Sequence, residues 1–512
     1  MSRMLLSGPD VEVRRRGSRT PVTVVATVAR PSEVTASRLR ALPAGVTGLE
    51  VRADLVGDLD PDWLRRHFTG RLIYTLRSSQ AGGAWADLTD VRRSRLRWAA
   101  GGYDVVDLEA DRDLSRDVLS AVPVHRRRIS WAGDPLALAA LRERFDRMAR
   151  HPAGSYLLAP EARSFDQALV PLQLLGQVRR LDVTAYATGS VGTWTRVLAP
   201  WLGAPVVSGR AGPAVAGTVT VDQLLSDYPF PDLPPLAALY GLVAPATNTT
   251  LFVRLLNTAC RQLRLPGLYV PFSVPDLQNF RGGFWPGIAG GAFDRLGLPV
   301  RGLTLAAPYK ETALTVADTV SPGARLAGAA NLLVRGGDGW RAATTDGTAV
   351  RAALAENGFT ATHRRVAVLG CGGAGRSTAV AFRAAGAQVT LVNRGLGRGR
   401  FAADLLGLPL VALREFDPTG YAAVVHATAA RDEAAFDVDR LPSGTAVADF
   451  VCAAGPTALV RAALARGLCT VDGRAVLGQE AALHFRQMTG RPMPTGTRLA
   501  MTGGGRSPAQ SR

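Results

Sequence analysis

Two short stretches of the chain carry residues that could do chemistry. The first, TLAAPYKETAL (304–314), contains Lys310, the only lysine among 512 residues that include 60 lysines and arginines in total. A lysine side chain can release and recover a proton, whereas an arginine keeps its charge because its pKa stays above about 12. Unless Lys310 survives by chance on the surface, its presence predicts a site that needs a proton-exchanging amine.

The second stretch is rich in glycine. In RRVAVLGCGGAGRSTAVAFRAAG (364–386), an apolar run leads into Gly370, Gly372 and Gly375, which complete the pattern G-x-G-x-x-G before a helix-like segment. In such a unit the first glycine permits a tight turn, the second lets a pyrophosphate approach, and the third lets helix and strand pack closely. Backbone N–H groups at the helix start bind the phosphates. The stretch predicts a dinucleotide site, with a plain glycine turn as the alternative.

The residues after the next predicted strand, AQVTLVNR (387–394), indicate which dinucleotide binds. An NAD site has an acidic residue here for the ribose 2′-hydroxyl. This chain instead has Asn393 and Arg394, followed by Arg398 and Arg400. Guanidinium groups pair with phosphate in a forked geometry, so we expect NADP, with its 2′-phosphate, as the cofactor.

Eight short apolar or β-branched runs precede these stretches. They recur at intervals of roughly 20–30 residues with helix-like segments between them, which is typical of a (β/α)₈ barrel. The predicted strands are 22–28, 48–55, 71–77, 103–110, 126–133, 154–160, 181–188 and 204–211. Since barrel sites lie at the C-terminal ends of strands, charged residues there are candidates for a ligand site, with ion pairs inside the barrel as the alternative. These residues are Glu50, Arg52, Asp54, Arg77, Asp107 and Glu109.

Composition limits the class of protein. Hydrophobic residues make up 47% of the chain and charged residues 20%, and no apolar run reaches membrane-span or signal-peptide length. We expect a soluble, cytoplasmic protein without membrane contact. The net charge of +18 is spread along the chain without a nucleic-acid-binding module, which favours small anionic substrates over nucleic acid. Four cysteines and six histidines lack metal-binding spacing, so no metal site is expected.

The order and spacing of several motifs resemble those of the shikimate dehydrogenase family over about residues 238–500. The motifs are GLTLAAPYK (302–310), GAANLL (328–333), ATTDG (343–347), the glycine turn with its following NR, and GRAVLGQEAALHF (473–485).

This resemblance implies roles for individual residues. Lys310 and Asp346 match the lysine and aspartate beside the substrate hydroxyl, which take or relay its proton during hydride transfer to a nicotinamide. Asn331 and Gln479 match residues that hydrogen-bond the ring hydroxyls. His426 falls at a strand end of the nucleotide domain and is expected to be a polar core residue, with a position near the cofactor as the alternative. The implied NADP-binding positions are Gly370, Gly372, Gly373, Ala374, Gly375, Asn393, Arg394, Arg398, Thr428 and Gly473.

The predicted substrate pocket departs from this family. The two serines that bind the substrate carboxylate correspond to NTTLFVRLLN (248–257), where only Thr249 and Thr250 offer suitable hydroxyls. The stretch TLAAPYK also lacks an asparagine and a threonine of the family motif. We therefore expect shikimate or a close cyclitol carboxylate, such as quinate or an aminated analogue, as the substrate.

The predicted barrel resembles type I 3-dehydroquinate dehydratase, and its fusion to a shikimate dehydrogenase resembles the bifunctional plant enzyme. The family forms a Schiff base between a strand-six lysine and the substrate ketone, with a strand-five histidine as acid and base. Leu157 and Ala132 stand at those positions, and residues 1–309 contain no lysine. We expect the barrel to be a degenerate dehydratase domain without dehydratase activity. The matching ligand-site positions are Glu50, Arg52, Arg77, Glu109 and Arg196.

Together these patterns predict an α/β protein with a TIM barrel, a substrate-binding domain and a C-terminal Rossmann domain. The predicted function is NADP-dependent oxidation and reduction of a cyclitol carboxylate. A non-catalytic pseudoenzyme that binds pathway intermediates, and a bifunctional dehydratase and dehydrogenase, are the alternatives. The expected boundaries are a flexible N-terminus (1–20), the barrel (21–226), a linker (227–236), the substrate-binding domain (237–350), the NADP-binding domain (351–478), a helix returning to the substrate domain (479–500) and a disordered tail (501–512).

Overall fold

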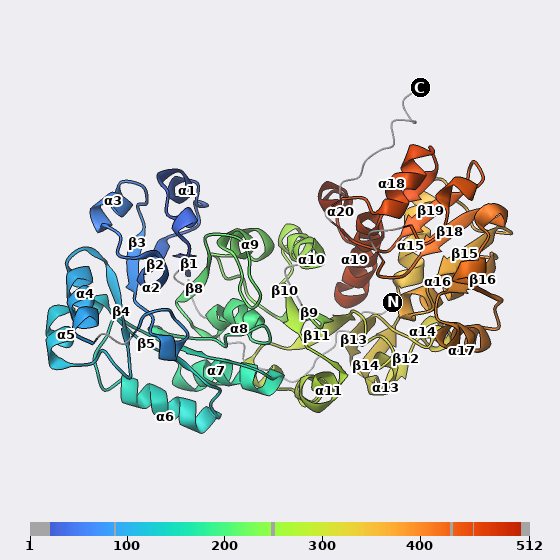
Figure 1. The fold of residues 1–512 in the computed structure, drawn as a ribbon. Helices are drawn as coiled ribbons and strands as arrows, with labels where there is room; N and C mark the ends of the chain where they lie inside the picture. Colours follow the sequence, from blue (N-terminus) through green and yellow to red (C-terminus); the bar gives the residue numbers. More distant parts are fainter. Residues whose placement is uncertain (1–20, 87–88, 247–250, 431–433, 454, 503–512) are drawn as a thin grey trace.

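The chain forms three β-sheets that follow one another along the sequence (Figure 1). In the computed structural model, the first sheet (blue to green) and the third (orange to red) lie at opposite ends of the molecule, with the second between them. The structure describes residues 21–86, 89–246, 251–430, 434–453 and 455–502. The expected flexible N-terminus, and all but the first two residues of the expected tail, lie outside these ranges.

The first sheet is an eight-stranded parallel barrel, which confirms the predicted fold. Its hydrogen-bonded order is β7-β6-β5-β4-β3-β2-β1-β8, a nearly closed ring. Most strand residues are buried, as expected for parallel strands whose two faces are covered by the barrel interior and the outer helices. The strands are β1 (Thr23–Val28), β2 (Gly48–Arg52), β3 (Arg71–Thr75), β4 (Val105–Glu109), β5 (Arg127–Gly133), β6 (Ser155–Pro160), β7 (Val183–Ala185) and β8 (Val206–Arg210). The helices are α1 (Ala36–Arg40), α2 (Ala53–Val56), α3 (Pro61–Arg65), α4 (Thr89–Gly102), α5 (Arg116–Ala121), α6 (Leu138–Met148), α7 (Phe165–Val178), α8 (Thr193–Leu198) and α9 (Val221–Asp227).

The second sheet is mixed, with the order β10-β9-β11-β13-β14-β12. β9, β10 and β11 run parallel, while β13 runs antiparallel to both β11 and β14. The strands are β9 (Ala238–Ala244), β10 (Gly267–Ser273), β11 (Val300–Leu305), β12 (Thr319–Val320), β13 (Leu332–Gly336) and β14 (Gly339–Ala343). The helical segments are α10 (Leu251–Gln262), α11 (Leu277–Asn279), η5 (Phe280–Phe284), α12 (Trp285–Ala289), α13 (Ala313–Val316) and α14 (Pro322–Ala327).

The third sheet is fully parallel, with the order β17-β16-β15-β18-β19-β20. Numbered from its first strand, this is the order 3-2-1-4-5-6 of a Rossmann fold, whose ligands bind where the order reverses, beside the first strand. The strands are β15 (Arg365–Leu369), β16 (Gln388–Asn393), β17 (Leu410–Ala412), β18 (Ala423–His426), β19 (Ala446–Asp449) and β20 (Cys469–Val471). The helices are α15 (Asp346–Glu356), α16 (Gly373–Ala384), α17 (Leu396–Leu406), α18 (Ala458–Ala465), α19 (Gly473–Thr489) and α20 (Thr495–Thr502).

The segment expected to be a linker, 227–236, is packed against the barrel. Tyr228 and Phe230 are buried, and the indole of Trp201 donates to the carbonyl of Pro234 at 3.1 Å. The proline-rich composition predicts a connection between domains, but its two aromatic rings bury against the barrel and fix the connection in place.

The expected returning helix is two helices. α19 begins beside the Rossmann sheet, and its Phe485 and Met488 join the core of the second sheet. Gly490 then adopts a φ of +71° and ends α19, since only glycine takes this left-handed conformation without strain. α20 continues to Thr502, so the first two residues of the expected tail are helical.

Candidate functional site

Lys310 lines a cleft between the second and third sheets and contacts Asp346, which is buried and does not itself line the cleft. Lys310 Nζ lies 2.7 Å from Oδ1 and 2.9 Å from Oδ2 of Asp346, so the ammonium group donates to both carboxylate oxygens. The lysine side chain is 16% exposed and the aspartate 3%. Burial alone would lower the pKa of Lys310, but the carboxylates of Asp346 and Glu480 outweigh burial and raise it. Lys310 is therefore an ammonium ion in the ligand-free protein.

Local packing holds Lys310 against the glycine turn. The ring of Tyr309 stacks on Phe280 with centroids 5.2 Å apart, and the carbonyl of Lys310 accepts from the N–H of Ala330 at 2.7 Å. A Cβ placed on Gly373 would lie 3.2 Å from the Cβ of Lys310. The lysine and the turn are thus in contact, although they lie far apart in sequence.

The glycine turn has the geometry that the sequence predicts. Gly370 has a φ of +107°, and a Cβ there would lie 2.7 Å from the carbonyl oxygen of Ala427. A Cβ on Gly375 would lie 1.8 Å from the carbonyl oxygen of Gly370, so strand and helix approach too closely for any side chain. Nothing lies within 4 Å of a Cβ on Gly372, which leaves its backbone open to a phosphate. α16 begins at Gly373, and no side chain caps this end, so its first backbone N–H groups have no partner within the helix and can bind a phosphate.

The end of β16 carries two free cations. The side-chain oxygen of Asn393 accepts from the N–H of Cys371 at 3.2 Å and so ties this strand end to the glycine turn. Arg394 and Arg398 are exposed and form no ion pair with any described residue. Arg398 also lines the cleft. A 2′-phosphate placed beside the turn would find these guanidinium groups unpaired.

The end of β18 carries a buried polar chain. Nδ1 of His426 lies 2.9 Å from Asp449, and Nε2 lies 2.6 Å from the hydroxyl of Thr428. A Cβ on Gly370 would meet the methyl of Thr428 at 2.8 Å, so this threonine borders the glycine turn. At Gly473, the first residue of α19, a Cβ would lie 2.3 Å from the backbone of Val451. His426 is 2% exposed and orients Thr428, which supports its interpretation as a polar core residue.

The cleft itself has a volume of about 560 Å³. Apolar side chains of β9, β11 and α19 form much of its wall, and Lys310, Glu311, Arg398 and Glu480 are its charged residues. Asn331 lies behind this wall: it is fully buried, and its amide donates to Glu480 at 2.8 Å and to Thr345 at 2.9 Å. The predicted Thr249 and Thr250 lie outside the described residues.

Gln479 does not line the cleft; its neighbour Glu480 does. Successive residues of a helix differ by about 100° in direction, so only one of the two can face the substrate side of α19. The Gln479 side chain is instead directed toward Glu356. The amide matches the expected hydrogen-bonding role, so Glu480 was missed. Its signal is that it lies one helical turn before the buried His484 and so shares that face of α19.

Arg376 is a second residue that the sequence analysis missed. It extends from α16 and is 1% exposed, yet its guanidinium reaches the neighbouring domain. It donates to the carbonyls of Ala327 (2.7 Å) and Gly328 (3.1 Å) at the end of α14, and to the carboxylate of Glu311 (2.8 Å). A buried arginine therefore joins the glycine-turn helix to the segment that carries Lys310.

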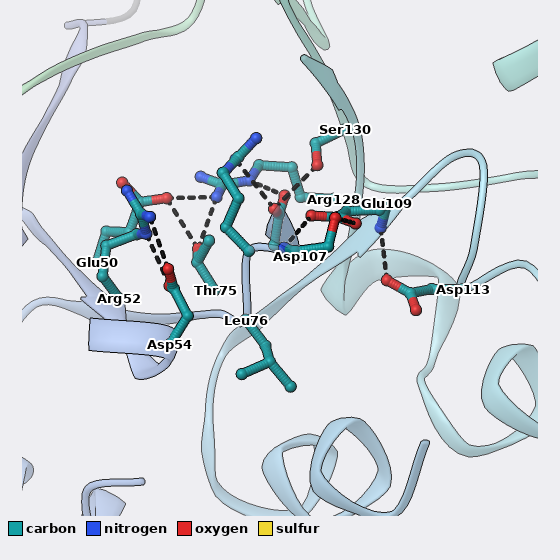
Figure 2. Close-up of polar contacts among 12 residues, drawn as sticks. Glu50, Arg52, Asp54, Thr75, Leu76, Asp107, Glu109, Asp113, Arg128 and Ser130 are labelled. Carbon is teal, nitrogen blue, oxygen red and sulfur yellow. Dashed lines mark hydrogen bonds and ion pairs between the residues drawn. The ribbon is translucent and has the colours of Figure 1, made fainter. Parts of the chain in front are cut away.

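A second cavity, of about 720 Å³, opens at the C-terminal ends of the barrel strands. Beneath it, Arg128 lies between two carboxylates (Figure 2). It forms a hydrogen-bonded ion pair with Glu50, and its Nε donates to Asp107 at 2.6 Å. Burial opposes the ionisation of Glu50, but Arg128 and Arg77 hold the pKa of that carboxyl well below its usual range. Much of the charge predicted at the ends of the barrel strands is thus neutralised in ion pairs, as the alternative interpretation of the sequence expects.

Four of the five predicted barrel residues line this cavity: Glu50, Arg52, Arg77 and Arg196. Glu109 does not; it is buried and accepts from the backbone and hydroxyl of Ser78 at 2.8 and 2.7 Å. It ends β4, and it lines a separate, smaller cavity together with Ser78 and with Gln80 and Ala81 of the η2 turn (Ser79–Ala81). The sequence analysis also missed Arg128, although it shares a strand face with Ser130 and Ala132 at a spacing of two.

The cavity floor is apolar where the resemblance places a lysine and a histidine. Leu157, Ala159, Tyr186 and Ala132 form a cluster there, and all four line the cavity. Arg196 lies over the ring of Tyr186 at 4.1 Å.

Two further features are absent from the described part of the chain. No group of three or more histidine, cysteine, aspartate or glutamate side chains there is arranged to hold a metal ion. No helix among the same residues has both the length and the apolar character needed to cross a bilayer.

The fold and the cleft define an α/β protein in which a (β/α)₈ barrel precedes a Rossmann-type nucleotide domain. A family model described as type I 3-dehydroquinase matches residues 23–231, and one described as shikimate dehydrogenase substrate binding domain matches residues 248–333. The shikimate dehydrogenase (NADP(+)) of Caulobacter vibrioides is 37% identical over 245 residues, which is 45% of this chain and 82% of that protein. The shikimate dehydrogenase (NADP(+)) of Acidiphilium cryptum is 34% identical over 256 residues, 49% of this chain and 89% of that protein.

Solved structures of similar proteins cover either the C-terminal half or nearly the whole chain. Shikimate 5-dehydrogenase from Thermus thermophilus, in complex with NADP(H) and shikimate, is 27% identical with a TM-score of 0.46, over 52% of this chain and 99% of that one. The dehydroquinate dehydratase and shikimate dehydrogenase from S. pombe is 20% identical with a TM-score of 0.41, over 95% and 98%. The chain belongs to the shikimate dehydrogenase family and carries a type I dehydroquinase domain in front of its dehydrogenase domain.

Proposed function

We propose that the protein is an NADP-dependent oxidoreductase that interconverts a ring hydroxyl and a ketone on shikimate or a close cyclitol carboxylate. The observation that carries this proposal is the contact of Lys310 with Asp346 beside the glycine turn. Dehydrogenation needs a proton-transfer group next to the nucleotide site, and this pair is positioned there.

Bound NADP supplies or accepts the hydride at the substrate carbon. In the reductive direction, the Lys310 ammonium donates its proton to the ketone oxygen, and Asp346 holds the ammonium in position and stabilises its charge. In the oxidative direction, Lys310 first releases its proton to solvent, and its neutral amine then receives the hydroxyl proton. Asn331, fixed by Thr345, orients Glu480 on the substrate side of α19.

NADP rather than NAD is supported by the unpaired Arg394 and Arg398 and by the relatives, whose names specify NADP(+). The open backbone at Gly372 and the first turn of α16 would hold the pyrophosphate. Asn393, Thr428 and Gly473 complete the proposed cofactor surface.

The test is NADPH oxidation with 3-dehydroshikimate, followed by absorbance at the nicotinamide band, with NADH as the comparison cofactor. We expect turnover with a clear preference for NADPH. Binding of NADPH without turnover of any cyclitol ketone would instead support the non-catalytic alternative.

For the barrel we infer that it performs no Schiff-base dehydration. The support is chemical: Leu157 and Ala132 line the cavity, and no lysine exists in residues 1–309 to form the imine. The test uses the full chain with 3-dehydroquinate, and formation of an enone chromophore at rates well above the uncatalysed reaction would contradict it. Borohydride added during the assay gives a second readout, since an imine would be trapped as a stable mass increase.

A further inference from the structure

Glu480 places a third ionisable group in the cleft, beside the Lys310–Asp346 pair. Its carboxylate lines the cleft, its side chain is 17% exposed, and one of its oxygens accepts from Asn331 at 2.8 Å. The positive charge of Lys310 is already engaged by Asp346 at 2.7 and 2.9 Å. Of the three charged groups, two are negative and one positive.

Apart from His484, no cationic side chain lies within ion-pair distance of Glu480 among the described residues. His484, one turn further along α19, lies 3.8 Å away, but burial lowers its pKa to about 3, with the charge of Lys310 adding to the effect, so it is neutral. Leu242 and Leu477, which line the same cleft, are apolar, and its other charged lining residues are Lys310, Glu311 and Arg398. Burial and the nearby Asp346 raise the pKa of Glu480 to about 7, despite the opposing influence of Lys310.

We propose that Glu480 is a specificity-determining residue, and that its carboxylate selects a ring substrate bearing an ammonium group over one bearing only hydroxyls. A ligand ammonium would form a charge-assisted hydrogen bond with Glu480 and balance the net negative charge of the group formed by Lys310, Asp346 and Glu480. A neutral hydroxyl could donate to the same oxygen but would leave that charge uncompensated. This inference rests on the proposed function, since it assigns the substrate class of the same cleft.

Substituting glutamine for glutamate isolates the effect of the negative charge of Glu480 on ligand selection. Glu480→Gln keeps the size of the side chain and the oxygen that accepts from Asn331, and it removes only the charge. Glu415→Gln is the matched control, because Glu415 lies on the surface and pairs with Arg414. The ligands are shikimate and the two analogues in which an amine replaces one of the hydroxyls that are not oxidised.

Binding is measured first, by isothermal titration calorimetry at pH 8 without cofactor, on the full chain. We expect at least one amine ligand to bind the wild type about tenfold or more tightly than shikimate, and the ratio to fall to about threefold or less in Glu480→Gln. Glu415→Gln should keep the wild-type ratio. Equal or tighter binding of shikimate to the wild type, absence of binding by either amine, or an unchanged ratio in Glu480→Gln would overturn the proposal.

Turnover of the same ligands with NADP⁺ is measured second and separates this inference from the proposed function. Glu480-dependent binding of the amine without hydride transfer would refute the proposed oxidoreductase and leave the specificity assignment standing. Turnover of shikimate with no preference for the amine ligands would instead refute the specificity assignment and leave the proposed oxidoreductase standing. A pH series adds a control, since amine affinity in the wild type should rise as pH increases from about 6 to 8 and Glu480 ionises, whereas Glu480→Gln should lack this rise.

Discussion

At the scale of single residues, the ammonium group of Lys310 is the feature on which the proposed chemistry depends. Substituting Lys310→Arg preserves positive charge next to Asp346 but replaces a group that can release its proton by one that cannot. We expect kcat for ketone reduction to fall by about 100-fold or more, with NADPH affinity within about threefold of the wild type. Steady-state kinetics and NADPH fluorescence titration measure the two quantities. A Lys310→Arg variant with more than a tenth of wild-type kcat would show that no proton passes through this side chain.

Glu480 should also make stability depend on pH. Its pKa rises from 4.5 to about 7 on folding, so the folded protein holds this proton more tightly than the unfolded chain. The stabilisation from this group is therefore full below about pH 4.5 and is lost as pH rises toward 7. Glu480→Gln removes that loss, so its stability relative to the wild type should be higher at pH 8 than at pH 4.5 by about 1–3 kcal/mol. Urea denaturation at both pH values measures this difference, and a difference of zero or of opposite sign would contradict the raised pKa.

Site residues could be predicted from the sequence only where their type and spacing were distinctive. Lys310, Asp346 and the glycines occur in distinctive types and spacings, and the structure brings them together. The choice between Gln479 and Glu480 depends on the rotation of one helix, which a one-residue shift reverses. Arg376 had no signal in the sequence, because its partners across the domain boundary are two backbone carbonyls and the carboxylate of Glu311, 65 residues away in sequence.

At the scale of elements, α16 both presents the glycine turn and holds the two dehydrogenase domains together through Arg376. Arg376→Ala would leave the carbonyls of Ala327 and Gly328 without their donor and Glu311 without its counter-ion. We expect the dehydrogenase region to lose about 2–4 kcal/mol of stability. Chemical denaturation measures the loss, with Arg461→Ala as control, since Arg461 is exposed and makes its one described side-chain hydrogen bond to the carbonyl of Pro456. Equal stability of the two variants would show that the contacts of Arg376 contribute nothing to the stability of the dehydrogenase region.

The elements themselves were largely predictable. Runs such as VTVVATV become buried parallel strands because both faces of a barrel strand are covered, and all eight predicted strands are present. The segment 227–236 was harder, because proline content indicates a connection while the burial of Tyr228 and Phe230 depends on the barrel surface that receives them.

At the scale of the whole molecule, the barrel and the second sheet share one hydrophobic core. Phe165 of α7 and Trp194 of α8 pack against Phe272 of β10, with ring centroids 6.5 and 5.2 Å away, and Phe284 and Phe293 close the cluster. The barrel therefore stabilises the dehydrogenase region whether or not it catalyses a reaction. The shared core gives a physical reason for a barrel whose sequence contains no lysine to remain attached.

Because the core is shared, a destabilising substitution in one of the two modules should also destabilise the other. Phe272→Ala is a change in the second sheet. It should lower the unfolding midpoint of the barrel as well as that of the substrate region, because the ring of Phe272 fills space between the two. The expected loss of stability is about 3–5 kcal/mol. Hydrogen exchange of barrel strands β7 and β8, followed by mass spectrometry on the full chain, reads the barrel separately from the dehydrogenase. The control is Leu181→Ala, whose side chain is 75% exposed and should change neither region. Faster exchange confined to the second sheet in Phe272→Ala would mean that the two modules are stable independently, and that the barrel is retained for a ligand of its own.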